Sequence, residues 1–230
     1  MDGLASRRYA VERMDDPALD PALHEDALRG LERINAVSAT ARALWRPLER
    51  LAAGGRLRVL DLACGAGDVA IALRRRARRK GIPIEVAACD RSPRALAHAR
   101  ERARRLGADV ELFSCDVLGD AFPVGFDAYV CTLFLHHLRE SEAVELLRRM
   151  ATGRALLASD LVRSQTGYWA ARLGTRFLTR SPVVHADAPA SVEGAFTPEE
   201  LRALADAAGI AGARIRPHWP FRMLLEWERA

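Results

Sequence analysis

A glycine-rich turn beside an aspartate is the part of the chain best suited to bind a small charged ligand. Residues 59–68 (VLDLACGAGD) have the pattern of a strand, a glycine turn and the first turn of a helix. Glycines let a ligand approach the backbone closely, and the free amides at a helix N-terminus face such a ligand. The spacing Gly65-x-Gly67-x-x-Ala70 also fits a dinucleotide fingerprint. The glycines therefore indicate binding without naming the ligand.

Three aspartates at the ends of predicted strands limit which ligand the turn could bind. Asp61 ends the first strand four residues before Gly65, where a carboxylate would repel a pyrophosphate and attract a cation. Asp90 ends the second strand, where the ribose hydroxyls of an adenosine cofactor lie in dinucleotide folds. Asp116 follows the third strand and can accept a hydrogen bond from an exocyclic amine such as that of adenine. Each could instead be a helix cap or a loop acid, but together they outline an adenosine joined to a cation.

Histidines are the candidates for a general base. His136 and His137 follow the fourth predicted strand, and for each the alternative is a packing role. His185 and Asp187 lie two residues apart in a later segment, and a carboxylate orients an imidazole and raises its basicity. We predict that His185, His137 and Asp187 are catalytic, with His185 deprotonating a phenolic or enolic acceptor. The alternative for His185 and Asp187 is an ordinary position in a surface loop.

The four cysteines give no sign of a metal site. Cys64, Cys89, Cys115 and Cys131 include no C-x-x-C pair, and their spacing fits neither a disulfide framework nor a common zinc pattern. We predict reduced thiols and no bound metal.

The elements that position these residues alternate in type. Short apolar runs separated by helical stretches predict a parallel sheet with crossover helices, and near-continuous apolar strands indicate helices on both faces. The chain is therefore expected to be α/β. Its predicted strands are 57–62, 84–89, 110–114, 128–132 and 154–160, with a helix over 141–150 before the last of them.

Helices are predicted before this sheet, and a helix and a hairpin after it. Asp20 and Ser38 are expected to cap helices over 21–35 and 39–52, which could cover the sheet edge. A capping box at Thr197 opens a helix that ends at Ala208. Two strands, 213–216 and 222–227, are separated by a short connection, which favours an antiparallel hairpin.

The segment 162–196 interrupts this alternation. It is expected to hold a helix over 168–180 and a loop over 181–195, forming a lid or substrate wall at the carboxyl end of a strand, where α/β sheets bind ligands. Trp169, Leu173 and Phe177 recur at helical spacing, and packing on the core is the favoured interpretation. Contact with a membrane interface or an apolar substrate is the alternative.

Length and charge restrict the remaining possibilities. The 230 residues are expected to form one domain, divided into N-terminal helices (1–55), a cofactor-binding core (56–161), the lid (162–196) and a final helix and hairpin (197–230). The sequence has no run of eighteen apolar residues and no secretory leader, so we expect a cytoplasmic protein. The net charge of +5 comes almost entirely from arginine, and the arginine run 74–79 lacks aromatic residues, which argues against a nucleic-acid partner.

These motifs resemble the class I S-adenosylmethionine-dependent methyltransferases, in particular the small-molecule branch that includes the ubiquinone and menaquinone methyltransferases. The resemblance is carried by residues 61–68, 89–92, 115–117 and 133–138 and covers about residues 57–160. It implies a Rossmann-like, seven-stranded, mostly parallel sheet with an antiparallel last strand. One departure is Ala63, where many members carry a third glycine.

The resemblance also implies a cofactor site for S-adenosyl-L-methionine. The methionine part would be surrounded by the first turn, the ribose would meet the end of the second strand, the adenine the end of the third, and the methyl group the end of the fourth. In that order the implied residues are Asp61, Ala63, Gly65 and Gly67; Asp90 and Arg91; Asp116 and Val117; and Thr132.

The implied activity is methyl transfer to an oxygen or carbon nucleophile of a small hydrophobic acceptor, such as a phenol, a quinol or a polyketide-like compound. Two alternatives stay open. An NAD(P)-dependent oxidoreductase is favoured by the Gly65 to Ala70 spacing and opposed by Asp61. A non-catalytic protein that binds S-adenosylmethionine would have the same crevice. Peripheral membrane contact is a further expectation, and the sequence does not set the oligomeric state.

Overall fold

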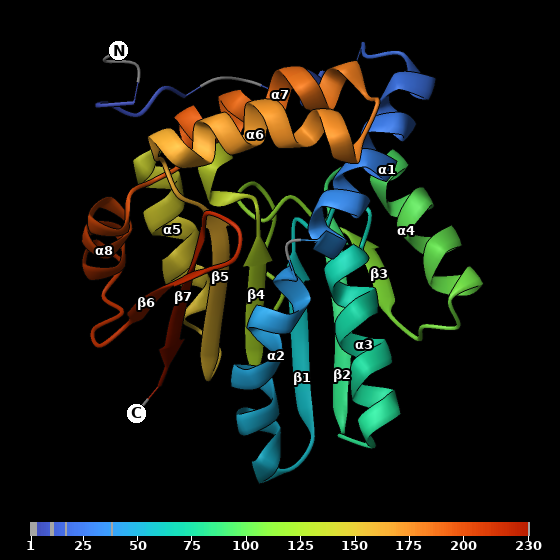
Figure 1. The fold of residues 1–230 in the computed structure, drawn as a ribbon. Helices are drawn as coiled ribbons and strands as arrows, with labels where there is room; N and C mark the ends of the chain where they lie inside the picture. Colours follow the sequence, from blue (N-terminus) through green and yellow to red (C-terminus); the bar gives the residue numbers. More distant parts are fainter. Residues whose placement is uncertain (1–3, 10–11, 17, 38, 230) are drawn as a thin grey trace.

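The chain folds around one mixed sheet covered by helices on both faces. The computed structural model describes residues 4–9, 12–16, 18–37 and 39–229. The seven strands lie in the order β3-β2-β1-β4-β5-β7-β6 (Figure 1). All neighbouring pairs are parallel except β5 with β7 and β7 with β6, because β7 runs against both. The predicted α/β fold, with its mostly parallel sheet and antiparallel last strand, is confirmed.

The parallel part follows the predicted elements closely. Its strands are β1 (Leu57–Leu62), β2 (Ile84–Asp90), β3 (Glu111–Ser114), β4 (Ala128–Thr132) and β5 (Ala155–Leu161), and its crossover helices are α3 (Asp68–Lys80), α4 (Pro93–Arg105) and α5 (Glu140–Met150). Leu57, Val59, Leu60 and Leu62 of β1 are all fully buried, as expected for a strand with helices on both faces. The regular strands therefore place the aspartates that follow them at one edge of the sheet.

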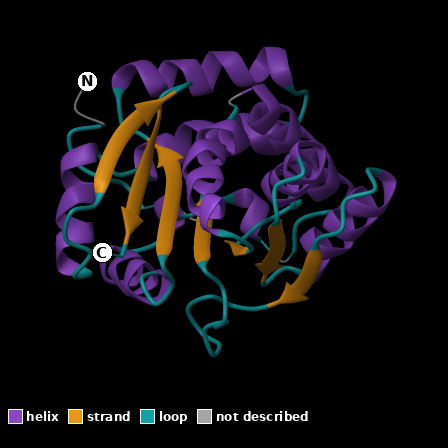
Figure 2. Ribbon diagram, turned by 90° about the horizontal axis from the view of Figure 1, so that it is seen from below, coloured by secondary structure: helices purple, strands orange, loops and turns teal. Residues whose placement is uncertain are grey.

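Two apolar clusters hold the helices to the sheet. Buried side chains of α2 (Thr40–Leu51), α3 and α4 pack on one face, and those of α5 and α8 (Pro198–Ala207) pack on the other. Figure 2 shows the sheet lying between helices. The capping box that begins α8 is formed: the Glu200 amide donates to Thr197 Oγ1 at 3.2 Å, and the Thr197 amide donates to the Glu200 carboxylate at 2.9 Å. The chain ends with the predicted antiparallel hairpin, β6 (Arg214–His218) and β7 (Arg222–Glu228).

The N-terminal helices differ in what they cover. Asp20 caps α1 (Pro21–Val37) as predicted, since its Oδ1 accepts from the Ala22 amide at 2.8 Å. The predicted cap Ser38 lies outside the described residues. Leu44, Trp45 and Leu48 of α2 are buried against a sheet face, so α2 does not cover the sheet edge. The short turns η1 (Arg13–Asp15) and η2 (Ala52–Gly54) precede α1 and follow α2.

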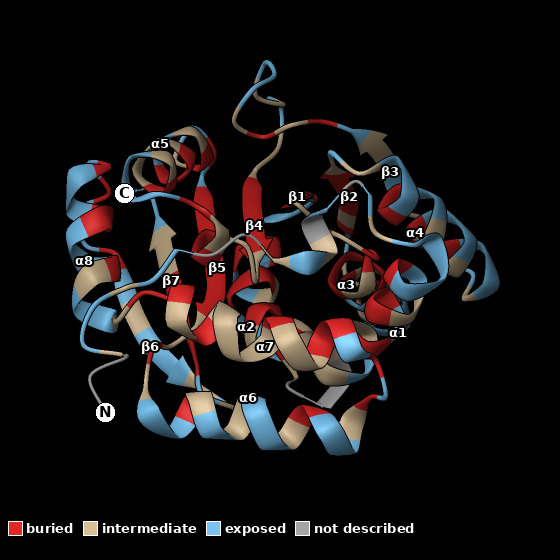
Figure 3. Cartoon of the chain, turned by 90° about the horizontal axis from the view of Figure 1, so that it is seen from above, coloured by how far each residue is buried: buried red, intermediate tan, exposed pale blue. Residues whose placement is uncertain are grey.

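The segment 162–196 forms two helices, so the loop predicted over 181–195 is wrong. Helix α6 (Gln165–Leu178) is followed by α7 (Pro182–Gly194), and both lie across the carboxyl ends of the parallel strands (Figures 1 and 3). Pro182 is in the first turn of α7, where a missing amide costs nothing. Val183 and Val184 pack with Ala27 of α1. This burial outweighs the interior Pro189 that the sequence suggests as a helix breaker.

A buried arginine closes the base of this two-helix segment. Arg163 precedes α6, and its guanidinium donates to the Ala195 carbonyl oxygen, which follows α7, at 2.7 Å. The same guanidinium makes two bonds to the Glu200 carboxylate, at 2.5 and 2.8 Å, and one to the Leu4 carbonyl at 3.1 Å. Arg163 therefore ties both ends of the helical pair to α8 and to the N-terminal segment.

Among the helices that the structure describes, none combines the length and the apolar character that crossing a bilayer requires.

Candidate active site

The strand order reverses between β1 and β4, and ligands of open α/β sheets bind at the carboxyl ends of strands at such a point. Helices α1, α6 and α7 lie over this edge (Figures 1 and 3). The opposite edge has a surface cavity of about 310 Å³ lined by Arg58, Glu85 and other residues at the amino ends of strands. It involves none of the predicted site residues.

The glycine turn has the strained backbone that a close-binding loop needs. Gly65 and Gly67 have φ of 52° and 69°, in the left-handed region that glycine adopts without steric cost. Ala63 has φ of 50°. The position where many members of the family that the sequence resembles carry glycine is therefore left-handed here as well. A Cβ on Gly67 would lie 3.0 Å from the Ala99 Cβ, whereas a Cβ on Gly65 would meet no atom within 4 Å. The Gly65 side of the turn is therefore open.

Asp61 lies beneath this turn with no exposed surface, and neither carboxylate oxygen makes a hydrogen bond among the described residues. Burial raises the pKa of Asp61 well above its usual value, and the nearby Asp68 carboxylate raises it further. The Ala70 amide opposes this rise. A buried carboxylate without a partner is costly, and a bound cationic or N–H-donating group would satisfy it.

Asp90 connects the second strand to the glycine turn. Its Oδ2 accepts from the Gly65 amide at 2.8 Å, and its Oδ1 accepts from the Ser92 amide at 2.8 Å. Each oxygen keeps a further lone pair. Asp90 therefore shapes the turn and can still accept from a ligand hydroxyl.

Asp116 uses one of its two oxygens within its own loop. Its Oδ1 accepts from the Leu118 and Gly119 amides, at 3.0 and 3.2 Å, and these bonds lower the pKa of Asp116. The positive charge of Arg91, which is exposed, adds to this lowering. Val117 is buried next to Asp116, and Thr132 ends β4 in register with Ser159 of β5. The residues predicted to hold the cofactor thus lie on adjacent strand ends.

Arg222 is a buried cation at the same edge that the sequence did not single out. It begins β7 opposite Leu161, donates to Thr40 Oγ1, and donates to Asn35 Oδ1 at 3.1 Å. Burial lowers the pKa of Arg222 to about 10, against the effect of Asp160 and Asp68. It thereby joins α1 and α2 to the sheet. In the sequence it is one of many arginines, and no local pattern marks it.

His185 and Asp187 do not form the predicted pair. Both lie on α7, where residues two apart point in different directions. The His185 Nε2 is 2.9 Å from the Thr179 carbonyl oxygen, at the end of α6. Asp187 accepts from the Arg13 and Met14 amides, at 3.1 and 3.0 Å. Each residue therefore has a structural partner of its own, and a catalytic role for either stays a prediction from the sequence.

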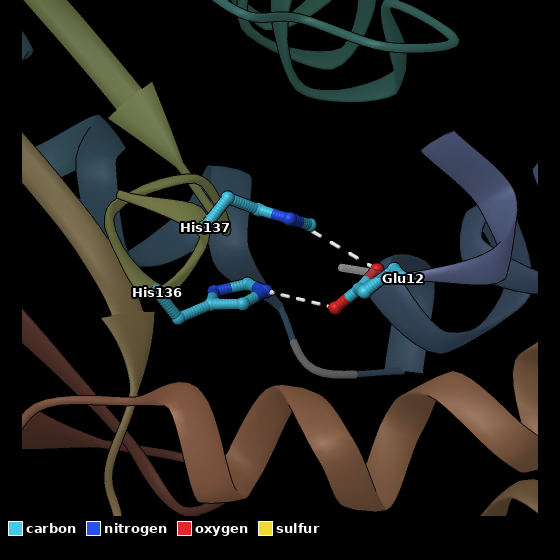
Figure 4. Close-up of side chains that lie close together, drawn as sticks. All are labelled: Glu12, His136 and His137. Atoms are coloured by element: carbon cyan, nitrogen blue, oxygen red, sulfur yellow. Dashed lines mark ion pairs between the residues drawn. The ribbon is translucent and has the colours of Figure 1, made fainter. Parts of the chain in front are cut away.

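His136 and His137 lie on the turn η3 (Leu135–His137) after β4, next to a glutamate from the N-terminal segment (Figure 4). The His136 Nδ1 is 2.6 Å from Asp160 Oδ1, and its Nε2 is 3.4 Å from Glu12 Oε1. The His137 Nε2 is 3.9 Å from Glu12 Oε2. Burial would lower the pKa of His136, but the charges of Asp160 and Glu12 raise it to about 10. Sequence reasoning missed Glu12 and Asp160, because neither is near the histidines in the chain.

His218, the last residue of β6, has both ring nitrogens engaged. Its Nε2 is 2.8 Å from Ser159 Oγ, and its Nδ1 is 3.0 Å from the Trp219 carbonyl oxygen. Burial lowers the pKa of His218. The four cysteines are buried, and none of them forms a disulfide.

Comparison with known proteins finds a family match for the central part of the chain. Residues 59–153 match the family model described as a methyltransferase domain. The match covers less than half of the 230 residues. The matched region contains every residue of the predicted cofactor set, together with His136 and His137, and it ends before α6 and α7. Among curated proteins, none matches the chain significantly in sequence.

Several solved methyltransferase structures have the same fold as this chain. Magnesium protoporphyrin IX methyltransferase from Synechocystis PCC 6803, with bound S-adenosylhomocysteine, is 18% identical with a TM-score of 0.59, over 95% of this chain and 92% of that one. An O-methyltransferase family 2 protein from Planctomyces limnophilus, in complex with apigenin, is 22% identical with a TM-score of 0.61, over 94% of this chain and 63% of that one. An amino-demethyl-riboflavin dimethyltransferase from Streptomyces davawensis is 22% identical with a TM-score of 0.61, over 86% and 55%. The chain thus spans less than two thirds of the last two proteins.

Proposed function

We propose that this protein transfers a methyl group from S-adenosylmethionine to an oxygen or carbon nucleophile of a small hydrophobic acceptor. The observation that carries the proposal is Asp61, fully buried and without a hydrogen-bond partner beside an open, left-handed glycine turn. An amino group would satisfy this carboxylate, whereas a dinucleotide pyrophosphate at the same turn would be repelled by it. The methyltransferase domain and the solved methyltransferases named above support the same cofactor.

The residues at the strand ends fit the parts of this cofactor. Asp61 would receive the amine, the remaining lone pairs of Asp90 the ribose hydroxyls, and Asp116 Oδ2 the adenine amine. The chemistry that the bound cofactor supplies is a methyl group activated on a sulfonium sulfur. The protein's contribution is then to align the acceptor with that methyl group, which can provide much of the rate enhancement of a displacement. Of the three predicted catalytic residues, only His137 lies in the methyltransferase domain.

The proposal is tested by calorimetric titration with S-adenosylmethionine, S-adenosylhomocysteine, NAD and NADP, using Gly65→Ala and a matched control. The control is Gly81→Ala at the far end of α3, because Gly81 is also left-handed (φ 65°) and also open. Both substitutions should cost about 1 kcal/mol of unfolding free energy, since both place a Cβ in left-handed backbone. Only Gly65→Ala should lose affinity for the adenosyl-sulfur ligands, by at least about 10-fold, because only its Cβ enters the ligand space.

Two results would contradict this assignment. One is tight binding of NAD or NADP with none of S-adenosylmethionine, which would favour the oxidoreductase alternative. The other is an equal, small effect of both glycine substitutions on S-adenosylmethionine affinity, which would place the cofactor elsewhere. A protein that binds the cofactor but methylates no phenol, quinol or polyketide-like acceptor would favour the non-catalytic alternative.

The outer face of α6 supports a lipophilic acceptor or a membrane-associated one. The favoured interpretation, that its apolar stripe packs on the core, is wrong: Trp169, Leu173 and Phe177 are 54%, 52% and 90% exposed. Arg172 and Arg176 are exposed on the same helix. Exposed aromatic and aliphatic side chains beside arginines are typical of a helix lying at an anionic membrane interface. Helix α6 itself lies across the carboxyl ends of the parallel strands (Figure 1).

Vesicle binding tests this proposed membrane contact. The double substitution Trp169→Ser, Phe177→Ser should reduce cosedimentation with phosphatidylglycerol-containing vesicles at least about 5-fold, because it removes the two large side chains that would enter the interface. Val124→Ser is the matched control, since Val124 is 77% exposed in the loop before β4, at the opposite edge of the sheet. The control should bind as the wild type does. Wild-type protein that stays in solution with these vesicles would contradict the proposal.

A further inference from the structure

Three potential metal ligands converge where the N-terminal segment meets η3. The nearest ligand atoms of Glu12, His136 and His137 all lie within 4.8 Å of one another, and the three side chains point toward a common centre (Figure 4). We propose that Glu12, His136 and His137 form a zinc site with one open coordination position. No pattern in the sequence predicts it, because Glu12 is more than 120 residues from the histidines.

The donor set and its spacing favour zinc. Two imidazole nitrogens and one carboxylate form a common set of protein ligands in zinc sites that keep an open position. Zinc–ligand bonds of about 2.0 to 2.1 Å place tetrahedral ligands about 3.3 to 3.4 Å apart. The His136 Nε2 lies 3.4 Å from Glu12 Oε1, and the His137 Nε2 lies 3.9 Å from the other carboxylate oxygen, Glu12 Oε2. Calcium and magnesium prefer oxygen ligands, so imidazoles argue against them.

Asp160 supplies the outer support that such sites use. Its Oδ1 is 2.6 Å from the His136 Nδ1, and its Oδ2 accepts from the His136 amide at 3.1 Å. A metal-binding histidine commonly donates its other ring N–H to a carboxylate, which fixes the ring and its tautomer. Here the arrangement leaves the His136 Nε2 directed at Glu12. Asp160 itself is buried, so the support is rigid.

Glu12 is also held in place from the other side. Ser191 of α7 donates its hydroxyl to Glu12 Oε1, and Asp187 of the same helix accepts from the Arg13 and Met14 amides. The glutamate is therefore positioned by the two-helix segment rather than by a free N-terminal strand. A bound zinc ion would join the N-terminal segment to η3, while Ser191 and Asp187 connect the same segment to α7. Partly exposed His137 leaves one side on which water or an acceptor oxygen could complete the coordination.

The test is zinc binding by tag-free, metal-stripped protein, measured by competition with a chromophoric chelator and by the absorption spectrum after cobalt substitution. We expect one equivalent of zinc with a Kd in the low micromolar range or below, and cobalt bands of tetrahedral intensity. Glu12→Gln and His137→Asn should each weaken zinc binding at least about 30-fold, since even outer-shell changes are worth about 10- to 100-fold. His98→Gln on α4 is the control and should leave the affinity unchanged.

A measurement independent of affinity separates loss of the site from loss of the fold. Zinc should raise the Tm of the wild type and of His98→Gln, and should leave the Tm of the two ligand variants unchanged. Circular dichroism of each variant without zinc reports whether its fold is intact. Fewer than about 0.2 equivalents bound to the wild type, or unchanged affinity in both ligand variants, would overturn the proposal. The cluster would then be a buried histidine held between two carboxylates.

Discussion

Asp61→Asn is expected to stabilise the ligand-free protein and to remove most of its affinity for S-adenosylmethionine. The Asp61 carboxylate is fully buried and lacks a hydrogen-bond partner, and an unsatisfied buried group costs about 1 to 3 kcal/mol or more when charged. The amide of asparagine removes the charge at nearly constant volume. We therefore expect a gain of about 1 kcal/mol in unfolding free energy. Affinity should fall at least about 30-fold, equivalent to about 2 kcal/mol, because the charge that would pair with the amine is lost.

The gain in unfolding free energy from Asp61→Asn should depend on pH. The pKa of Asp61 is raised in the folded protein, so above about pH 4 the folded state binds the Asp61 proton more tightly than the unfolded state does. Stability then falls as the pH rises from the unfolded pKa to the folded one. The asparagine variant lacks this contribution, so its advantage should be larger at pH 8 than at pH 5.

Denaturant unfolding at both pH values and calorimetric titration measure the two effects. Asp109→Asn is the control, because the Asp109 side chain is 96% exposed. The substitution weakens only an ion pair with Arg74, in which the nearest nitrogen and oxygen are 3.6 Å apart. The control should change stability by less than about 0.5 kcal/mol and leave affinity unchanged. Destabilisation by Asp61→Asn together with full retention of affinity would show that Asp61 is a structural residue.

The parts of the structure that the sequence predicted correctly are those set by local patterns. The strands β1 to β5 follow from apolar runs bounded by turn residues, and the glycine turn follows from its spacing. The aspartates at the strand ends then fall at one edge, because parallel strands bring their carboxyl ends together. These signals are contained within about ten residues each. The grouping of these residues at one edge of the sheet could therefore be predicted before the fold was seen.

The errors in the segment 162–196 have a different physical origin. Helical periodicity shows which residues share a face of α6, but it does not show what covers that face, and here nothing described covers Phe177. The prolines in the α7 segment suggested a loop. Val183 and Val184 are instead buried against α1, which stabilises a helix there. Both outcomes depend on contacts between segments that are distant in the sequence.

The same reason explains which charged residues were missed. Glu12, Asp160 and Arg222 meet their partners across 24 to 187 residues of chain. Each is unremarkable in its local sequence. His185 and Asp187 are the opposite case, because they are close in the sequence but do not meet in the structure. On a helix they point in different directions and bond to different partners. Pairs of chemically useful residues therefore need the fold before they can be assigned.

Arg163→Met is expected to cause a large loss of stability and to loosen the two-helix cover of the active site. Arg163 is buried, joins the two ends of the segment 162–196 and makes two bonds to Glu200. Methionine keeps much of the side-chain volume but leaves the Ala195 carbonyl and part of the Glu200 carboxylate unpaired. Hydrogen bonds to charged groups are worth about 1.5 to 3 kcal/mol each, and the half-exposed Glu200 regains some hydration. We expect a loss of about 2 to 4 kcal/mol.

Arg163→Met should affect the binding of the acceptor more than the binding of the cofactor. The predicted cofactor residues lie at the ends of β1 to β4, and Arg163 bonds none of them, so the Kd for S-adenosylmethionine should change less than about 3-fold. The KM for an acceptor should rise about 10-fold or more, because α6 and α7 cover the site where it would bind. Glu199→Gln is the matched control: Glu199 is the exposed neighbour of Glu200 in the first turn of α8, and removing its charge should cost less than about 1 kcal/mol. Equal losses of cofactor and acceptor binding in Arg163→Met would show that the cover and the cofactor site unfold together, which would contradict a separable role for α6 and α7.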